Sequence, residues 1–550
     1  MEHATLHALQ LTGIVITLGG AFFVLALLGP LSARIKGEGA FPFFAALEKN
    51  AGRWTAIGAA AAAFAVFLDF FVQVAEVQGL TIFGGVGLPT VIRFIGSTTV
   101  GRIAALRMAL LLLAAAATKL PARAKWWGVL ALGLAAAVCS ALVSHAAAQP
   151  ESNASAIVIH LAHVLAAAAW IGVLIHLLAS RERITRAEAP AEVSGIAEIV
   201  RRFSPLALGA SSLIAVSGVL AAVRYLGSVS AVPTSAYGLT LVVKLALLLP
   251  LLVAGWTNFR VVRPALLQLT AQPGARASGE LRRGTLQLFG RMLELEVTAG
   301  ILVIAVAGIL GSVSPPFEDS AVLLTAQQSA ALVTPDLPTT TLIDPASFYG
   351  AAQRTVDDLR YSEFMHNYSG IMVMLLGLAW LVQSLRGTPG KAAARAWPFL
   401  MIPFAVFIAV AADPEVFILK QVTYLEALQD PQILEHQIGT LLVLVLIWFG
   451  WRDRRRPEEE RPLGFILPSL MILGSLLLLG HAHSFLTNTQ ELTNLINVQH
   501  AMIGACGLFA GTARWLELRA LLPERVARFL WPGFVISVGV IMTFFYRELV

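Results

Sequence analysis

The chain has 550 residues, of which 57% are hydrophobic and 13% are charged. A soluble domain carries about a quarter charged residues, so lipid, and not water, must be the main solvent of this chain. The net charge of +6 lies mainly in short loops between apolar segments, which indicates membrane orientation and not nucleic-acid binding. Cys139 and Cys506 are the only cysteines, which excludes a disulfide framework and a CxxC metal site.

Hydrophobic runs predict an all-α, polytopic transmembrane bundle of about fourteen spans, because a bilayer crossing needs ~20 apolar residues. The expected spans are 9–31, 55–77, 102–120, 126–147, 157–179, 204–226, 239–259, 292–312, 366–385, 397–412, 436–451, 464–482, 497–516 and 530–546. The first run has no Lys or Arg before it, so we expect a span and not a signal peptide. The segment Leu80–Thr99 contains Pro89 and Arg93, and we expect it to lie at the membrane interface without crossing.

Alternate loops are basic, and these seven loops hold 30 of the 39 Lys and Arg residues. Because positively charged loops face the cytoplasm, both termini and the acidic segment 313–365 are predicted to be extracytoplasmic. This segment divides the chain into a membrane domain of about eight spans, residues 1–312, and a C-terminal membrane domain of about six spans, residues 366–550.

Ten of the eleven histidines are predicted to lie at extracytoplasmic helix ends or on the N-terminal tail, and only His176 lies near a cytoplasmic end. Neutral imidazole is the commonest metal ligand in proteins. His160 and His163 are three residues apart on one helix face, and His145 closes the preceding span, so these three are the first candidate ligands. The other candidates are His481, His483 and His500 as a second group, His366 and His436 as bridges, and His3 and His7 on the tail.

Two further patterns could bind copper. The sequence Met1-Glu2-His3 offers an amine, two amides and a third-position imidazole, a planar nitrogen set that suits Cu(II). Cys139 and Cys506 lie six residues from His145 and His500, about 9 Å deeper along their helices, and are candidate softer ligands for Cu(I). The competing interpretation is that the histidines anchor the membrane interface and the cysteines are small packed residues.

Charged residues within spans are costly and usually functional. Asp69, Arg107 and Lys244 are predicted at similar depths, which favours an ion pair or a triad among them. Glu294 and Glu296 open the eighth span near the cytoplasm, where they could relay ions. No GxxxxGK[ST] motif is present, so transport would be passive, ion-coupled or handed on by a partner, and no enzymatic activity is expected.

In these motifs the chain resembles the copper-resistance D (CopD) family of bacterial inner-membrane proteins. The resemblance runs through Ser144-His145-Ala146, His163 to Gly172, Tyr237 to Lys244, and Asn258-Phe259-Arg260. Serine replaces the family's glycine before His145, and His160 stands where the family often has aspartate, which would make the site all-nitrogen. The C-terminal part is similar to the extension of long family members through Glu363 to Asn367, Asp413-Pro414-Glu415, Asp430 to His436, Gly480 to His483, and Arg514 to Arg519.

The resemblance implies a multi-pass protein of the bacterial inner membrane that serves copper homeostasis. It also implies passage of copper, as Cu(I) or Cu(II), across that membrane and a periplasmic copper-binding partner of the CopC type. The first alternative is a haem b-binding electron carrier or an oxidase-assembly protein, because facing histidines at equal depth can ligate haem. The second is a scaffold whose histidines only sense external pH.

Overall fold

The structure is a computed structural model whose described residues form helices joined by loops and contain no strand. It describes the whole chain except residues 1, 35–40, 79–85, 122–123, 145–152, 272–277, 318–319, 340–342, 348–353, 386–387, 454–462 and 481–488.

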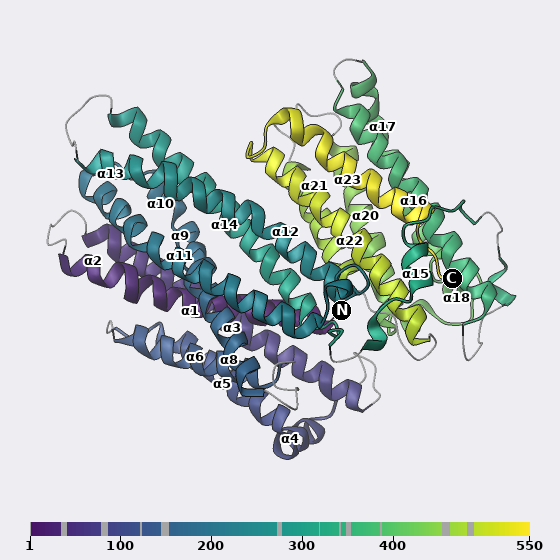
Figure 1. Cartoon of the computed structure of the whole chain (residues 1–550), viewed down its shortest axis with the longest axis horizontal. Coiled ribbons are helices and arrows are strands. Elements are labelled where there is room, and N and C mark those ends of the chain that lie inside the picture. The colour runs from purple at the N-terminus through teal and green to yellow at the C-terminus, as the bar shows by residue number, and fades with distance from the viewer. Residues whose placement is uncertain are drawn as a thin grey trace.

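The first half of the chain is a bundle around α1 (Glu2–Phe22), which packs against α3, α6, α14 and the helix formed by α8 and α9 (Figure 1). Small residues let these helices approach closely, as is common in membranes: a Cβ at Gly19 would lie 2.4 Å from the backbone of Gly172. The other main helices are α3 (Phe41–Val77), α5 (Thr99–Ala117), α6 (Lys125–Leu142), α8 (Asn153–Ala167), α9 (Val173–Ala179), α11 (Pro190–Leu226), α12 (Ala236–Thr257), α13 (Arg263–Ala271) and α14 (Ser278–Leu310).

Three of the predicted spans in this half contain a π-helical stretch, a local widening that is frequent at functional sites. The stretches are η1 (Phe23–Leu28), η2 (Ala168–Gly172) and η4 (Asn258–Val262). The shorter helices of this half are α2 (Gly29–Arg34), α4 (Leu88–Ser97) and α10 (Arg181–Thr185), with a 3-10 turn at η3 (Val229–Ala231).

The second half is a smaller bundle in which α23 packs between α16 and α22. Its long helices are α16 (Val356–Gln383), α17 (Thr388–Ala411), α20 (Pro431–Asp453), α21 (Leu463–Gly480), α22 (Gln490–Leu518) and α23 (Glu524–Phe544). Its short elements are η5 (Ser320–Val322), α15 (Ala326–Ala331), η6 (Pro345–Ser347), α18 (Pro414–Phe417) and α19 (Tyr424–Ala427). The two halves meet where α12 and α14 contact α21 and α22, and Leu247, Val306, Leu479 and Leu508 share one buried cluster there.

The prediction of a polytopic helical bundle is confirmed, and each predicted span coincides with a helix. Within the described chain, twelve helices are long and apolar enough to cross a membrane. The remaining two are the short α21 and the more polar α22, which buries Gln499 and His500 inside the bundle. In the segment expected at the interface, the described residues before Thr99 form the ten-residue α4, which is too short to cross.

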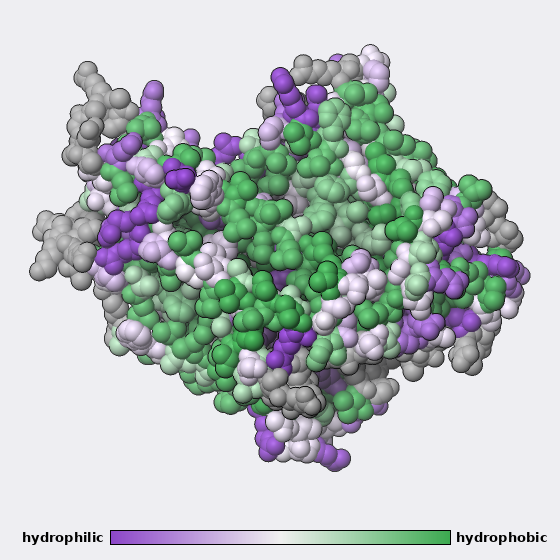
Figure 2. Space-filling model, viewed as in Figure 1, coloured by the Kyte–Doolittle hydropathy of each residue, from purple (hydrophilic) through white to green (hydrophobic). Residues whose placement is uncertain are grey.

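The loops gather at two ends of the bundle, separated by a broad hydrophobic band (Figure 2). One end, here called the loop end, carries both termini and the described residues of segment 313–365; there the backbone N–H of Asp336 donates to Phe544 at 2.9 Å (Figure 1). At the other end the basic loops meet, and Arg291 donates to the Ala520 carbonyl at 2.9 Å. The described parts of the loops predicted to be cytoplasmic therefore share one end of the molecule.

Candidate metal centre at the loop end

Three of the predicted ligands, His145, His481 and His483, lie outside the described residues. Across the rest of the chain, no three His, Cys, Asp or Glu side chains are grouped so as to hold a metal ion. The two predicted three-histidine groups each include residues outside the described part of the chain and stay predictions. Four of the seven described histidines of the loop end, however, share one feature of their hydrogen bonding.

Four histidines of the loop end are held through the same ring nitrogen, Nδ1. The pairs are His3 with Asp69 at 2.7 Å, His163 with Ser217 at 2.9 Å, His366 with the Ser362 carbonyl at 2.8 Å, and His436 with Asp413 at 2.8 Å. A carboxylate or carbonyl oxygen can only accept, and the Ser217 hydroxyl already donates to the Leu213 carbonyl, so Nδ1 donates in each pair. A neutral imidazole that donates through Nδ1 keeps its lone pair on Nε2.

This arrangement is the one that metal-binding histidines generally have, because a hydrogen bond to the second nitrogen sets the ring orientation and the tautomer. His176, at the other end of the fifth span, is held differently. Its Nε2 lies 2.9 Å from the Ile16 carbonyl, and its ring is 1% exposed and stacks on Phe23. His176 is therefore a packed core residue, and the histidines at the two ends differ in chemistry as well as in position.

His366 and His500 lie side by side. The former comes from α16 and the latter from α22, and their ring centroids are 5.7 Å apart at an interplanar angle of 61°. Each lies ten residues from the start of its helix, about 15 Å along it, so the two are at matched depth. The two rings can meet because α23, which packs between α16 and α22, ends at Phe544. Beyond this residue no part of α23 separates the two helices.

The residues that follow α23, 545–550, cover this pair and are here called the C-terminal strap. Tyr546 of the strap stacks on His366 with centroids 3.7 Å apart and lies edge-on to His500 at 6.0 Å. Its hydroxyl donates to Glu548 at 2.9 Å, and Arg354 binds the same carboxylate at 2.7 Å. Burial raises the pKa of Glu548 and of Tyr546 above their ordinary values.

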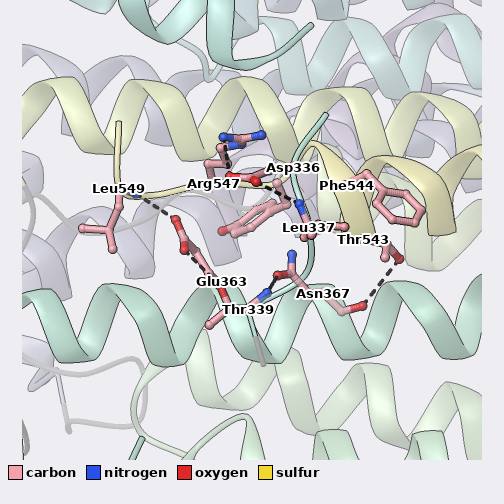
Figure 3. Close-up of a pocket in the computed structure, with 10 residues that line it drawn as sticks. Asp336, Leu337, Thr339, Glu363, Asn367, Thr543, Phe544, Arg547 and Leu549 are labelled. Atoms are coloured by element: carbon pink, nitrogen blue, oxygen red, sulfur yellow. Dashed lines mark hydrogen bonds and ion pairs between the residues drawn. The ribbon is translucent and has the colours of Figure 1, made fainter. Parts of the chain in front are cut away.

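A polar cavity of about 180 Å³ lies beside the strap (Figure 3). Glu363 of α16 accepts from the backbone N–H groups of Glu548 and Leu549 at 2.7 and 2.9 Å, and Asn367 accepts from Thr339 at 2.9 Å. Arg547 binds Asp336 at 2.9 Å across the cavity. The strap is thus joined to both α16 and segment 313–365 by hydrogen bonds and an ion pair.

His160 and His163 occupy α8, where His163 is held by Ser217 of α11. The ammonium of Lys244 on α12 is within electrostatic range of both imidazoles. A cation at that position opposes the binding of a metal ion and must be overcome or displaced for these histidines to act as ligands. The sequence had suggested a grouping of Lys244 with Asp69 and Arg107, which stays a prediction; the sequence had not indicated the electrostatic interaction of Lys244 with the histidines.

Asp69 lies near the N-terminus of α1. It accepts from His3 and, at 3.2 Å each, from Gln10 and Gln73. Arg107 is within electrostatic range of this carboxylate and donates to Ser140 at 3.3 Å. The predicted Asp69–Arg107 pairing is therefore an interaction across α3 and α5, while the hydrogen bonds of Asp69 go elsewhere.

The remaining predicted residues have separate surroundings. The His7 ring packs against Gly311, where an added Cβ would lie 2.7 Å from it. Cys139 is buried on α6 and Cys506 is half-buried on α22, and both are free thiols. Six residues rotate an α-helix by about 600°, so Cys506 and His500 point to different sides of α22. These two therefore cannot share an ion from one helix face.

Glu294 and Glu296, at the basic end, have different partners. Glu294 binds Arg181 at 3.2 Å and Arg519 at 3.6 Å and so joins the two halves of the chain. Glu296 is 2% exposed and accepts from Asn258 in the π-helical stretch η4 at 2.8 Å. Glu294 therefore links the two halves of the chain, whereas Glu296 is a buried acid that is hydrogen-bonded to the Asn258 side-chain amide.

The fold defines a polytopic helical membrane protein, and four imidazoles of its loop end are held through Nδ1. Residues 3–153 match the Copper resistance protein D-like, N-terminal domain, and residues 197–310 match Copper resistance protein D. Both matches are to models of the copper resistance protein D (CopD) family, the family that the motifs of the chain had indicated. Residues 311–550, which hold His366, His500 and the strap, lie outside both matches. No curated protein and no solved structure matches the chain.

Proposed function

We propose that this protein binds copper at the imidazoles of its loop end and carries it across the bacterial inner membrane, with the loop end facing the periplasm. The family is one of copper resistance. The observation that carries the proposal is the common anchoring of His3, His163, His366 and His436 through Nδ1. Rings held in this way present Nε2, which is the lone pair that a copper ion would use.

The first binding site in this proposal is built on α8 by His160 and His163, with His145 as the predicted third ligand. Ser217 orients His163, since its hydroxyl is committed as a donor to Leu213 and can only accept from the ring. An all-nitrogen site suits Cu(II) and also binds Cu(I). A periplasmic partner of the CopC type would deliver the ion.

Copper binding is tested with the full-length protein in detergent, loaded with Cu(I) or Cu(II) alone and analysed for metal content. The expected result is bound copper that His163→Ala reduces by about one equivalent. Ser217→Ala keeps His163 and removes only the hydroxyl that accepts from its Nδ1–H. We therefore expect the copper to be retained, with an affinity about 10-fold lower, because loss of a hydrogen-bond partner of a metal-binding histidine typically has an effect of this size. Glu426→Gln changes an exposed residue of the same end and is the matched control.

Two outcomes would overturn the binding proposal. A protein that holds no copper under either condition does not have the proposed site. A Soret absorbance band in the purified protein would indicate haem and support the electron-carrier alternative.

Transport is tested in proteoliposomes that enclose a copper-sensitive dye. The wild type is expected to admit copper, and His163→Ala is expected to slow its entry at least as strongly as it lowers binding. Copper that binds but never enters would leave the protein as a copper-binding membrane protein without a transport role. Loss of copper tolerance in cells that lack the protein, restored by wild type and not by His163→Ala, gives an independent readout.

A further inference from the structure

A buried acid lies between two helices in the first half of the chain, towards the basic end. Glu296 of α14 is 2% exposed, and its Oε2 accepts from the side-chain amide of Asn258 at 2.8 Å. Asn258 is the first residue of the π-helical stretch η4, which continues α12, and α12 packs along α14 (Figure 1). A Cβ added at Gly255 of α12 would lie 3.1 Å from Oε1 of Glu296, so the glycine leaves space for the carboxyl.

Glu296 lies within the hydrocarbon part of its span. Beyond Glu296, α14 continues through residues 297–310 to the loop end, which corresponds to a rise of about 21 Å. Because the hydrocarbon core of a bilayer is about 30 Å thick, this depth places Glu296 in the half of the core nearer the basic end. Glu294, two residues earlier, already pairs with Arg181 and Arg519 at that end. Water at the basic end is therefore the nearer aqueous phase for Glu296.

No cation balances a charge on Glu296 within the described chain, where its one hydrogen bond is that from Asn258. The elements packed against α14 are α1, η2, α9, α10, α12, η4, α13 and α21. At the basic end, the titratable side chains of these elements, of α14 beside Glu296 and of the turn after α22 are His176, Arg181, Glu182, Arg183, Arg260, Arg263, Glu294 and Arg519. None of these groups is within electrostatic range of the Glu296 carboxyl. A charge on Glu296 would be both buried and unpaired, which is costly in lipid.

Asn258 gives a second indication that this carboxyl carries a proton. Its side-chain nitrogen donates to Glu296, while its Oδ1 is buried and accepts no hydrogen bond from the described chain. A carboxylate has no proton to donate, whereas a neutral carboxyl adds one O–H donor beside this acceptor. The amide belongs to a π-helical stretch, a feature that is frequent at functional sites. These observations favour the neutral form of Glu296 in the arrangement described.

We propose that Glu296 is a proton-binding site whose proton must leave for copper to cross the membrane. The proposal rests on the proposed transport function and adds a residue that controls it. The O–H bond of the carboxyl breaks, the proton passes to water at the basic end, and the remaining carboxylate offsets one positive charge of a crossing ion. After the ion has left, the carboxylate takes up a proton from the same water.

The proton on Glu296 is tested with dicyclohexylcarbodiimide, an apolar reagent for neutral carboxyls, on the full-length protein in detergent. The carboxyl proton moves to a reagent nitrogen and the carboxyl oxygen bonds to the central carbon, so mass spectrometry of the peptide locates the adduct. We expect an adduct at Glu296 that decreases at least 10-fold as the pH is raised. Glu296→Gln should remove it, and Glu280→Gln, at an exposed acid of the same helix, should not. No adduct at Glu296 at any pH would overturn the proposal.

The role in transport is tested in proteoliposomes with equal pH on both sides, an enclosed copper-sensitive dye and Cu(I) alone supplied outside. Wild-type copper entry is expected to accelerate as the pH is raised through the range in which labelling decreases. Glu296→Gln resembles the neutral acid permanently, so its copper entry should be at least 10-fold slower and should lose this acceleration. The histidines are the same in both proteins, so the part of the pH response that the variant loses belongs to Glu296.

A second variant distinguishes a proton site from a structural carboxyl. Glu296→Asp keeps a group that can gain and lose a proton, and it is expected to restore at least part of the pH response that Glu296→Gln lacks. Both variants should retain the copper bound at the loop end, which shows that they are folded. A Glu296→Asp protein that is folded, carries no adduct and behaves as Glu296→Gln in transport would contradict the proton role.

The outcomes also separate this inference from the proposed function. If the wild type admits no copper, the proposed transport function fails and the role of Glu296 in it fails as well. If the wild type admits copper and Glu296→Gln admits it at the same rate with the same pH response, only the role of Glu296 is wrong. Copper entry that follows the sodium concentration and not the pH would make the carboxyl a sodium site and would also overturn the proton role.

Discussion

Tyr546 of the C-terminal strap stacks on His366 of α16 with their ring planes within 11° of each other. The Tyr546 hydroxyl binds Glu548, so one side chain joins the strap, α16 and a buried carboxylate. We expect Tyr546→Phe to keep the stack and lose only this hydrogen bond, at a cost of about 1.5–3 kcal/mol because the acceptor is charged. Tyr546→Ala should cost more, since it also leaves a cavity. Denaturant unfolding in detergent gives the order, and equal effects of the two variants would contradict it.

Arg354 and Glu548 form a buried pair, with side chains 15% and 1% exposed and an N–O distance of 2.7 Å. Removing one member of such a pair leaves an uncompensated charge, so Arg354→Ala is expected to destabilise the protein by about 3–5 kcal/mol. Glu548→Gln in the same chain should recover part of this loss. The double-mutant cycle measures the coupling, and additive effects would show that the pair is not an energetic unit.

Glu415 of α18 predicts a pH dependence of stability. Burial, with a further contribution from the Asp413 carboxylate, raises the pKa of Glu415 above its ordinary value. A carboxyl whose folded pKa is raised stabilises the fold fully below the unfolded pKa, and this stabilisation is lost as pH rises through the folded pKa. Glu415→Gln should therefore remove a decline in melting temperature that the wild type shows above about pH 4.3, the ordinary glutamate pKa.

Glu426 is the contrasting case for that measurement. Hydrogen bonds from Thr423 lower its pKa, so its contribution is present above the unfolded pKa and is lost as pH falls through the folded one. Glu426→Gln should therefore lower the melting temperature above the unfolded pKa, and its difference from the wild type should disappear as pH falls through the folded pKa. If both variants shift the pH profile in the same direction, the assignment of Glu415 is wrong.

The close packing of α1 against η2 at Gly19 and Gly172 should contribute to the stability of the protein. A Cβ at Gly172 would lie 2.4 Å from the Val15 carbonyl, so Gly172→Ala is expected to cost about 1–3 kcal/mol through overpacking. Gly209 of α11 has open space around its Cβ position, and Gly209→Ala should stabilise the helix by up to about 1 kcal/mol. Thermal unfolding compares the two, and similar changes would show that the contact is not tight.

We expect the positive charge of Lys244 to lower the affinity of His160 and His163 for copper. Because its ammonium is within electrostatic range of His160 and His163, Lys244→Gln should relieve repulsion of a bound cation and tighten copper binding. At an effective dielectric constant of about 20 such repulsion is worth on the order of 1 kcal/mol or more, which corresponds to several-fold in affinity. Lys420→Gln, at an exposed position of the same end, is the control. Weaker binding by Lys244→Gln would show that the ammonium helps to build the site.

The strap and the His366–His500 contact could not be predicted from the sequence. His366 and His500 each stood out as polar residues inside apolar runs, but nothing in their spacing indicates that they meet. The acceptors Ser217, Ser362 and Asp413 were not recognised as partners of the histidines. Tyr546 and Glu548 were missed entirely, because Tyr546 is the final residue of the last predicted span and Glu548 follows it, where neither residue type indicates a site.

What the sequence determined by itself is the class of protein, the helical spans and the sorting of loops and histidines. These follow from local terms: about 20 apolar residues make a span, and the placement of Lys and Arg distinguishes the two ends. Only the tertiary structure decided which polar side chains meet. One example is the contact of His366, His500 and Tyr546, which lies beyond the end of α23 at Phe544. Such contacts depend on helix neighbours, rotation and depth, and these are set by packing across the whole bundle and not by any one segment.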